Sequence, residues 1–197
     1  MMQAPKKSTV VTPKRGLAAI VGLATAALLL TSTPKEESGR TVKVTMTNDG
    51  TAKVQHVSGR QYLRAYLDIV DVPTICDGLT SIHGRKVRVG DSLTEDQCAV
   101  LLEEELTTHA KGVMACTPGL ALTIPDRDRA RFAAVSLAYN VGVANWCGST
   151  ARKRFDAGRI LEGCDALLMW NKAGGRVVNG LVARRQRERA VCVLDAA

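Results

Sequence analysis

The side chains of this 197-residue chain that could ligate a metal or act as nucleophiles include six cysteines and three histidines. No pair of cysteines has the Cys-x-x-Cys spacing of a zinc site and no stretch is rich in histidine, so we expect no metal and no cofactor. An even number of cysteines in an oxidising compartment predicts disulfide bonds instead. One set of pairings joins neighbouring predicted elements in every case. That set is Cys76 with Cys98, Cys116 with Cys147, and Cys164 with Cys192.

Imidazole titrates near neutral pH and can work as an acid or a base. Of the three histidines, His56 is the candidate for such a role. The alternative for His56 is a half-exposed position at the end of a strand. We expect His83 in a loop and His109 on a helix to face solvent, and Glu103-Glu104-Glu105 to form a solvated helix face without a chemical role.

An apolar segment of eighteen uncharged residues, 16–33, lies between the basic pair Lys14-Arg15 and Lys35. Its length predicts a membrane-spanning helix, and the basic residues in 1–15 favour a cytoplasmic N-terminus, so the rest of the chain is exported. A cleaved secretory signal is the alternative, but no small-x-small cleavage site follows the segment and Pro34 comes directly after it. We therefore favour an uncleaved anchor. Its many small residues would let it leave the bilayer again.

The formal charge of +8 and the pI near 9.4 predict an anionic partner for the exported part. Nucleic acid fits poorly, since the basic residues are scattered and only 4% of residues are aromatic, which leaves no stacking platform. A polyanionic cell wall fits better.

The elements that must position any site can be predicted along the chain. Residues 34–40 are polar and predict a linker, and alternation in 41–47 and 51–57 around Asn48-Asp49-Gly50 predicts a hairpin. Residues 60–90 predict a small, turn-rich β-sheet. Thr94 and Gln97 form a capping box that begins a helix running to about residue 113.

The remainder of the chain predicts helices. The expected helices span about 126–139, up to a break at Gly142, then about 149–155, 160–170 and, after a glycine-rich loop, 181–194. A small β-region followed by a helical lobe is an α+β arrangement, and the cleft between the two lobes is the expected binding site.

Four sequence blocks, in order, resemble one known family. The blocks are Ala65-Tyr66-Leu67-Asp68-Ile69-Val70, Val72-Pro73-Thr74-Ile75-Cys76-Asp77-Gly78, Ala138-Tyr139-Asn140-Val141-Gly142, and Trp170 to Gly175 with Gly180 to Arg185. Over about residues 56–194 the chain resembles the phage-type lysozymes of the endolysin class. The resemblance implies a lysozyme-like α+β domain over 58–197, with a small β-lobe, a larger helical lobe and a cleft, preceded by 34–57 as a linker or hairpin.

That family cleaves peptidoglycan with a Glu, an Asp nine residues later and a Thr six residues after the Asp. Asp68 and Thr74 match the last two positions. The resemblance implies that an ionised Asp68 stabilises an oxocarbenium-like transition state while the Thr74 hydroxyl holds a water on the opposite face. The alternative for Asp68 is a carboxylate that caps a turn.

The resemblance also implies further residues around the cleft. Gly78, Tyr139 and Asn140 match substrate-binding positions, where the amide can bond to an N-acetyl group, and a helix-end core pair is the alternative for the last two. Arg184 and Arg185 match a pair near the catalytic region, with plain surface charge as the alternative.

The family's glutamate is missing from its expected place, where this chain has Ser58-Gly59. Glycoside cleavage needs a proton delivered to the leaving oxygen, and neither residue can deliver one. Three explanations remain open. His56 could be the acid, Asp71 could be recruited, or the domain has no acid and only binds glycan.

The function that follows is a muramidase that cleaves the β-1,4 bond between N-acetylmuramic acid and N-acetylglucosamine and lyses a bacterial host. Transglycosylase-type cleavage and a non-catalytic peptidoglycan-binding module are the alternatives. Some family members carry a signal-arrest-release segment, which implies that 16–33 holds the chain in the host inner membrane facing the periplasm, inactive until release. We expect a monomer whose partners are glycan strands and this membrane.

Overall fold

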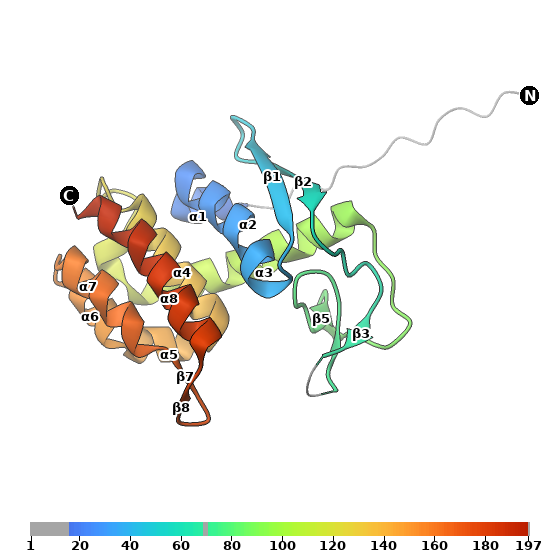
Figure 1. Cartoon of the computed structure of the whole chain (residues 1–197). Helices are drawn as coiled ribbons and strands as arrows, with labels where there is room; N and C mark the ends of the chain where they lie inside the picture. The colour runs from blue at the N-terminus through green and yellow to red at the C-terminus, as the bar shows by residue number, and fades with distance from the viewer. Residues whose placement is uncertain (1–15, 69–70, 197) are drawn as a thin grey trace, which may run out of the picture.

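The structure, a computed structural model, describes residues 16–68 and 71–196. The predicted basic tail at 1–15 lies outside the described residues. Figure 1 shows a helical lobe and a smaller lobe of short hairpins, with helix α3 running between them. The first half contains α1 (Leu17–Val21), α2 (Leu23–Glu37), β1 (Thr41–Met46), β2 (Ala52–Ser58), β3 (Tyr66–Leu67), β4 (Pro73–Thr74), β5 (Ser81–Ile82), β6 (Arg85–Lys86) and α3 (Glu95–Cys116). The second half contains η1 (Pro118–Leu120), α4 (Asp128–Val141), α5 (Val143–Gly148), α6 (Thr150–Asp156), α7 (Ile160–Ala166), η2 (Leu167–Met169), β7 (Lys172–Ala173), β8 (Arg176–Val177), α8 (Asn179–Cys192) and η3 (Val193–Asp195).

The apolar segment forms two helices rather than one, because Gly22 takes a positive φ of 88° and ends α1. Helix α2 then continues through Pro34 to Glu37, so residues 34–37 of the predicted linker are its last turn. The apolar face of both helices lies in the core, where Leu17, Val21 and Leu29 have no exposed surface. Among the described residues, none of the helices combines the length and the apolar character that crossing a membrane requires.

The predicted hairpin is confirmed as β1 and β2, which pair antiparallel with Val44 opposite Val54. Its alternation puts Val42 and Val54 against the core while Lys43 and Lys53 face solvent. In Figure 1 the hairpin lies beside α2. The residue before β1, Arg40, and the residue after β2, Gly59, lie close together. A side-chain carbon on Gly59 would lie 2.7 Å from the Cα of Arg40.

The small lobe consists of the hairpins β3–β4 and β5–β6 with turns rather than a continuous sheet. Their own buried residues, which include Ile75 and Val87, form a second small core against the start of α3. The predicted capping box of α3 is confirmed. The backbone N–H of Gln97 donates to Thr94 Oγ1, and the backbone N–H of Thr94 donates to Oε1 of the Gln97 side chain.

The helical lobe packs around α4, which is buried over most of its length. The predicted break at Gly142 and the Ser149 cap of the next helix are confirmed, whereas α5 and the β7–β8 hairpin were not predicted. All three predicted disulfides are confirmed, since Cys76–Cys98, Cys116–Cys147 and Cys164–Cys192 are bonded.

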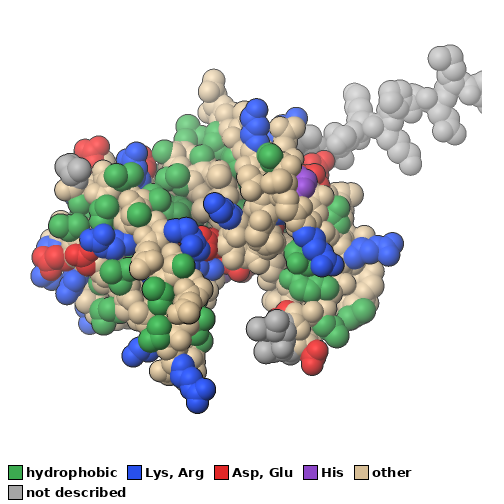
Figure 2. Space-filling model, viewed as in Figure 1, with side chains coloured by type: hydrophobic (Ala, Val, Ile, Leu, Met, Phe, Trp, Pro, Cys, Tyr) green, Lys and Arg blue, Asp and Glu red, His purple; other side chains and the backbone are tan. Residues whose placement is uncertain are grey.

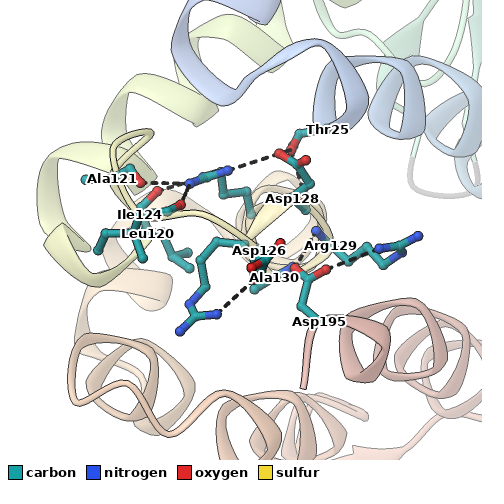
Figure 3. Close-up of polar contacts among 11 residues, drawn as sticks. Thr25, Leu120, Ala121, Ile124, Asp126, Asp128, Arg129, Ala130 and Asp195 are labelled. Atoms are coloured by element: carbon teal, nitrogen blue, oxygen red, sulfur yellow. Dashed lines mark hydrogen bonds and ion pairs between the residues drawn. The ribbon is translucent and has the colours of Figure 1, made fainter. Parts of the chain in front are cut away.

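The N-terminal end of α4 is fixed by residues from distant parts of the chain (Figure 3). The Asp195 carboxylate accepts hydrogen bonds from the backbone N–H groups of Arg129 and Ala130, so a residue of the C-terminal η3 caps this helix. Thr25 Oγ1 donates to the Asp128 carbonyl at 2.9 Å. Helix α2 is therefore held to α4 by a polar contact as well as by apolar packing.

Candidate functional site

An open cavity of about 260 Å³ lies where the two lobes meet. The end of α2, the loop after β4, and helices α3 and α4 supply its walls. Its lining residues are Glu37, Gly78, Leu79, Thr80, Ser81, Glu105, His109, Tyr139 and Asn140. Figure 2 shows a notch in the surface between the helical lobe and the smaller lobe. The three predicted substrate-binding residues, Gly78, Tyr139 and Asn140, are thus brought together in one cavity.

Glu37 is a carboxylate in this cavity that the sequence interpretation missed. It is the last residue of α2, and its Oε1 accepts a hydrogen bond from Arg184 Nη1 at 2.8 Å. The other face of its side chain lies over Gly78, where an added Cβ would be 3.6 Å from Glu37 Oε2. A Cβ would fit at that distance, so what favours glycine at position 78 is its positive φ of 81°.

The arginine that holds Glu37 belongs to a buried charge cluster on α8. Glu188 accepts hydrogen bonds from Ser136 Oγ at 2.7 Å and from Arg185 Nη2 at 2.8 Å, and Arg184 Nε lies 3.4 Å from it. Burial raises the pKa of the Glu188 carboxyl, and the neighbouring arginines oppose that change. The predicted alternative of plain surface charge for Arg184 and Arg185 is wrong, because both are buried.

The opposite wall contains an aromatic pair. The rings of His109 and Tyr139 have centroids 5.1 Å apart, and His109 Nδ1 lies 2.9 Å from the Glu105 carbonyl oxygen. Burial raises the pKa of the Tyr139 hydroxyl. The prediction that His109 faces solvent is wrong, since its side chain is 17% exposed and lines the cavity, whereas His83 is exposed as predicted.

The acidic run on α3 is also divided differently from the prediction of a solvated face. Glu105 lines the cavity, and Glu103 is half-buried beside the start of α1, where the Leu17 N–H donates to its Oε1 at 3.4 Å. Burial raises the pKa of Glu103. Glu104 is exposed, and the side chain of Glu105 is 43% exposed although it borders the cavity.

Asp68 and Thr74 lie on the β3–β4 hairpin, where Tyr66 pairs with Thr74. Asp68 Oδ1 accepts a hydrogen bond from the Val72 N–H at 2.8 Å, so the carboxylate does cap the turn. Thr74 is 4% exposed, and its hydroxyl donates to the Val72 carbonyl at 3.0 Å. Neither residue lines the cavity that contains Glu37.

The two predicted substitutes for the missing acid lie elsewhere. His56 is near the end of β2, its backbone N–H donates to Glu95 Oε1 at 2.5 Å, and its buried Nδ1 has no hydrogen-bond partner among the described residues. Asp71 is exposed in the turn after Asp68, with a positive φ of 60°. Neither residue is among those that line the cavity.

A small hairpin-rich lobe, a helical lobe and a carboxylate in the cleft between them define a lysozyme-like protein. The fold is similar to that of the endolysin from Escherichia coli O157:H7 phage FAHEc1, at 29% identity and a TM-score of 0.60 over 70% of this chain and 86% of that one. It is also similar to a point mutant of P22 lysozyme, at 26% identity and a TM-score of 0.59 over 83% of this chain and 94% of that one.

The phage lysozyme family model matches residues 57–188, and the chain belongs to this family. It is 36% identical over 146 residues to the SAR-endolysin of Enterobacteria phage P21, covering 74% of this chain and 79% of that protein. It is 39% identical over 133 residues to the SAR-endolysin of Pseudomonas phage phiKMV, covering 66% and 77%. The chain is therefore a glycosidase, a muramidase of the peptidoglycan-degrading type, which overturns the alternative of a non-catalytic binding module.

The family match begins twenty residues after Glu37, so the resemblance could not point to this carboxylate. Asp68 follows Glu37 by 31 residues rather than nine, and the β1–β2 hairpin occupies most of the difference. Two signals in the sequence could have located it. Glu37-Ser38-Gly39 directly precedes the hairpin pattern. The acidic pair Glu36-Glu37 also has two possible ion-pair partners three residues apart, Arg184 and Arg187.

Proposed function

We propose that the chain hydrolyses the β-1,4 bond between N-acetylmuramic acid and N-acetylglucosamine, with Glu37 as the general acid. The observation that supports this is the position of Glu37 in the cavity shared by Gly78, Tyr139 and Asn140. Protonation of the leaving oxygen requires a carboxyl group within reach of a bound sugar, and a carboxyl group that lines the cavity at the end of α2 supports this role for Glu37.

Asp68 and Thr74 keep the roles that the family resemblance gives them in this proposal. Asp68 carries the negative charge that stabilises the transition state. The Val72 N–H that donates to Asp68 Oδ1 fixes the orientation of the carboxylate for this role. The role of Thr74 in orienting the attacking water requires its hydroxyl to be uncovered when substrate binds, because Thr74 is 4% exposed and its hydroxyl donates to the Val72 carbonyl.

The test compares Glu37→Gln with its neighbour Glu36→Gln in purified protein acting on outer-membrane-permeabilised cells. Loss of a general acid lowers kcat by about 10² to 10⁴-fold. Glu36 is the matched control because it pairs with Arg187 and does not line the cavity. We expect Glu37→Gln to bind peptidoglycan without lysing cells while Glu36→Gln lyses them. Lysis by Glu37→Gln at the wild-type rate would contradict the proposal.

Mass spectrometry of the digested peptidoglycan separates the two routes of cleavage. Hydrolysis leaves a reducing N-acetylmuramic acid end, and transglycosylation leaves an anhydro sugar. We expect the reducing end. The same measurement with His56→Ala and Asp71→Asn tests the other two candidate acids, and both variants should give the wild-type products at near wild-type rates.

We further propose that residues 16–33 hold the new chain in the host inner membrane and then leave it to form α1 and α2. The basic residues before the segment and the SAR-endolysin names of the relatives support this. Because α2 ends at Glu37, a chain whose segment remained in lipid would lack its acid in the cleft. The membrane-bound form is therefore inactive.

Carbonate extraction before and after depolarisation of the membrane, with N-terminal sequencing, tests this second proposal. We expect the full-length chain to move from the membrane to the periplasmic fraction on depolarisation, and lysis to begin then. A mature N-terminus after residue 33 from the outset would contradict it.

A further inference from the structure

The chain contains a fully buried carboxylate, Asp77, to which the resemblance gave no role. Its oxygens are bound by the guanidinium of Arg40, with Arg40 Nε 2.7 Å from Oδ1 and Nη2 2.7 Å from Oδ2. Ser38 Oγ lies 2.7 Å from the same Oδ1. Both donors come from the three residues that follow Glu37, so the network holds the chain just after the end of α2.

The Ser38 hydroxyl has one proton for two acceptors. Its Oγ lies 2.8 Å from the Pro34 carbonyl as well as 2.7 Å from Asp77. A charged acceptor forms the stronger hydrogen bond, which favours Asp77. Either way, Ser38 joins the last turn of α2 to the carboxylate.

Asp77 is itself fixed to the small lobe and to α3 through its neighbours in the chain. Its neighbour Cys76 is bonded to Cys98 on α3, and the Cys76 N–H donates to the Tyr62 carbonyl at 2.8 Å. Its other neighbour is Gly78, the residue over which the Glu37 side chain lies. The network therefore connects the end of α2 to the loop that carries Gly78, the residue beside the Glu37 carboxylate.

Stability alone does not explain this pair. Burying two charges costs hydration, and apolar residues of similar volume often replace such a pair with no loss of stability. Arg40 Nη1 also has no hydrogen-bond partner among the described residues, although it is buried. The hydrogen bond to Asp77 raises the pKa of Arg40, so the guanidinium stays charged. The pair instead fixes the orientation of the two segments that it joins, because a guanidinium that binds two oxygens holds both partners in one plane.

We infer that Arg40 and Asp77 are positioning residues that orient the last turn of α2 so that the Glu37 carboxyl stands over Gly78 in the cleft. This inference rests on the proposed role of Glu37. It predicts that loss of the pair lowers kcat while substrate binding persists, because the side chains on the other walls are untouched.

The experiment uses the purified chain and soluble peptidoglycan fragments, with kcat and KM measured well below the Tm of each variant. We expect Asp77→Asn to lower kcat by at least about tenfold and to change KM by less than about twofold. Arg40→Lys keeps the charge but cannot bind both oxygens, so its kcat should be intermediate. Phe155→Leu, a destabilising change in the buried core of α6, is the control that should leave kcat unchanged.

The double variant Arg40→Met with Asp77→Leu separates positioning from stability. Apolar replacement should restore the Tm towards the wild-type value while kcat stays low. Recovery of both Tm and kcat would overturn the inference, as would a wild-type kcat in Asp77→Asn.

A double-mutant cycle with Glu37→Gln distinguishes failure of this inference from failure of the proposed function. If Asp77 acts through Glu37, Asp77→Asn causes no further loss of kcat in the Glu37→Gln background. Full additivity of the two losses would overturn the positioning role and leave Glu37 as the acid. A wild-type kcat in Glu37→Gln alone would refute the proposed function directly.

Discussion

Deleting residues 41–58 and joining Arg40 to Gly59 removes the β1–β2 hairpin and with it His56. The deletion separates Glu37 from His56 as candidate acids, because Glu37 precedes the hairpin and His56 lies on β2. If Glu37 is the acid, the shortened chain should still cleave peptidoglycan.

The structure shows that the join needs little movement. A Cβ on Gly59 would lie 2.7 Å from Arg40 Cα. With a bond of about 1.5 Å to that Cβ, the two Cα atoms are at most about 4.2 Å apart, near the ~3.8 Å of adjacent residues. Arg40 keeps its bonds to Asp77, and α2 keeps its contacts with α4.

The stability cost follows from the apolar side chains that are lost. Val42 and Val54 are 5% and 8% exposed, and burying two valines contributes about 3 to 6 kcal/mol. The net loss is smaller because the deleted residues no longer lose conformational freedom. We expect the Tm to fall by roughly 10 °C, which leaves a folded enzyme at room temperature.

Turbidity loss of permeabilised cells measures the outcome, with circular dichroism and a thiol count as checks on folding. The expected rate is within about threefold of wild type, whereas removal of a general acid would lower it by about 10² to 10⁴-fold. The point variant His56→Ala is the control that keeps the hairpin. A folded, glycan-binding deletion variant that does not lyse cells, together with an inactive His56→Ala, would refute the assignment of Glu37.

Three further predictions concern stability. The hydrogen bond from the Arg187 guanidinium holds the pKa of Glu36 below its ordinary value of 4.5. The pair therefore stabilises the fold above pH 4.5. This contribution is lost as the pH falls through the pKa that Glu36 has in the folded chain. Glu36→Gln should therefore cost about 0.5 kcal/mol in urea unfolding near neutral pH and nothing in strong acid, and a cost independent of pH would contradict this. Asp195→Ala should cost about 1 kcal/mol and speed hydrogen exchange at the start of α4, since it removes a helix cap; unchanged exchange there would count against the cap. Replacing Cys164 and Cys192 by serine should cost about 3 kcal/mol by calorimetry with kcat unchanged at low temperature, because the bond lies outside the cavity; a loss of kcat there would contradict that separation.

Local signals in the sequence predicted much of the fold. The turn at Asn48-Asp49-Gly50, the box at Thr94 and the Gly142 break each act within a few residues, so each could be recognised without the tertiary structure. The disulfides followed because each joins elements that were already predicted as neighbours.

The site was harder to predict because its geometry depends on contacts between distant segments. Glu37 lies beside Gly78 and Arg184 only in the folded chain, where the β1–β2 hairpin brings the residues before and after it together. A search for a glutamate nine residues before Asp68 cannot find a glutamate that precedes such a hairpin. His109 and Glu105 are polar residues on an amphipathic helix, and periodicity alone cannot distinguish a face that borders a cavity from one that borders bulk solvent.

The same reasoning gives a physical account of the weak apolar segment. In the folded chain its small residues permit close packing, since Ala26 is fully buried and α2 packs against α4, whose buried residues include Ala133 and Ala134. Larger side chains at such positions would strengthen insertion into lipid but would overpack this contact. A segment that first occupies a membrane and then carries Glu37, the proposed acid, to the cleft must be acceptable to both surroundings. The mixture of Leu and Ile with Ala, Gly and Thr satisfies both requirements. Thr25 is an example for the folded chain, because its hydroxyl donates to the Asp128 carbonyl when α2 is packed against α4.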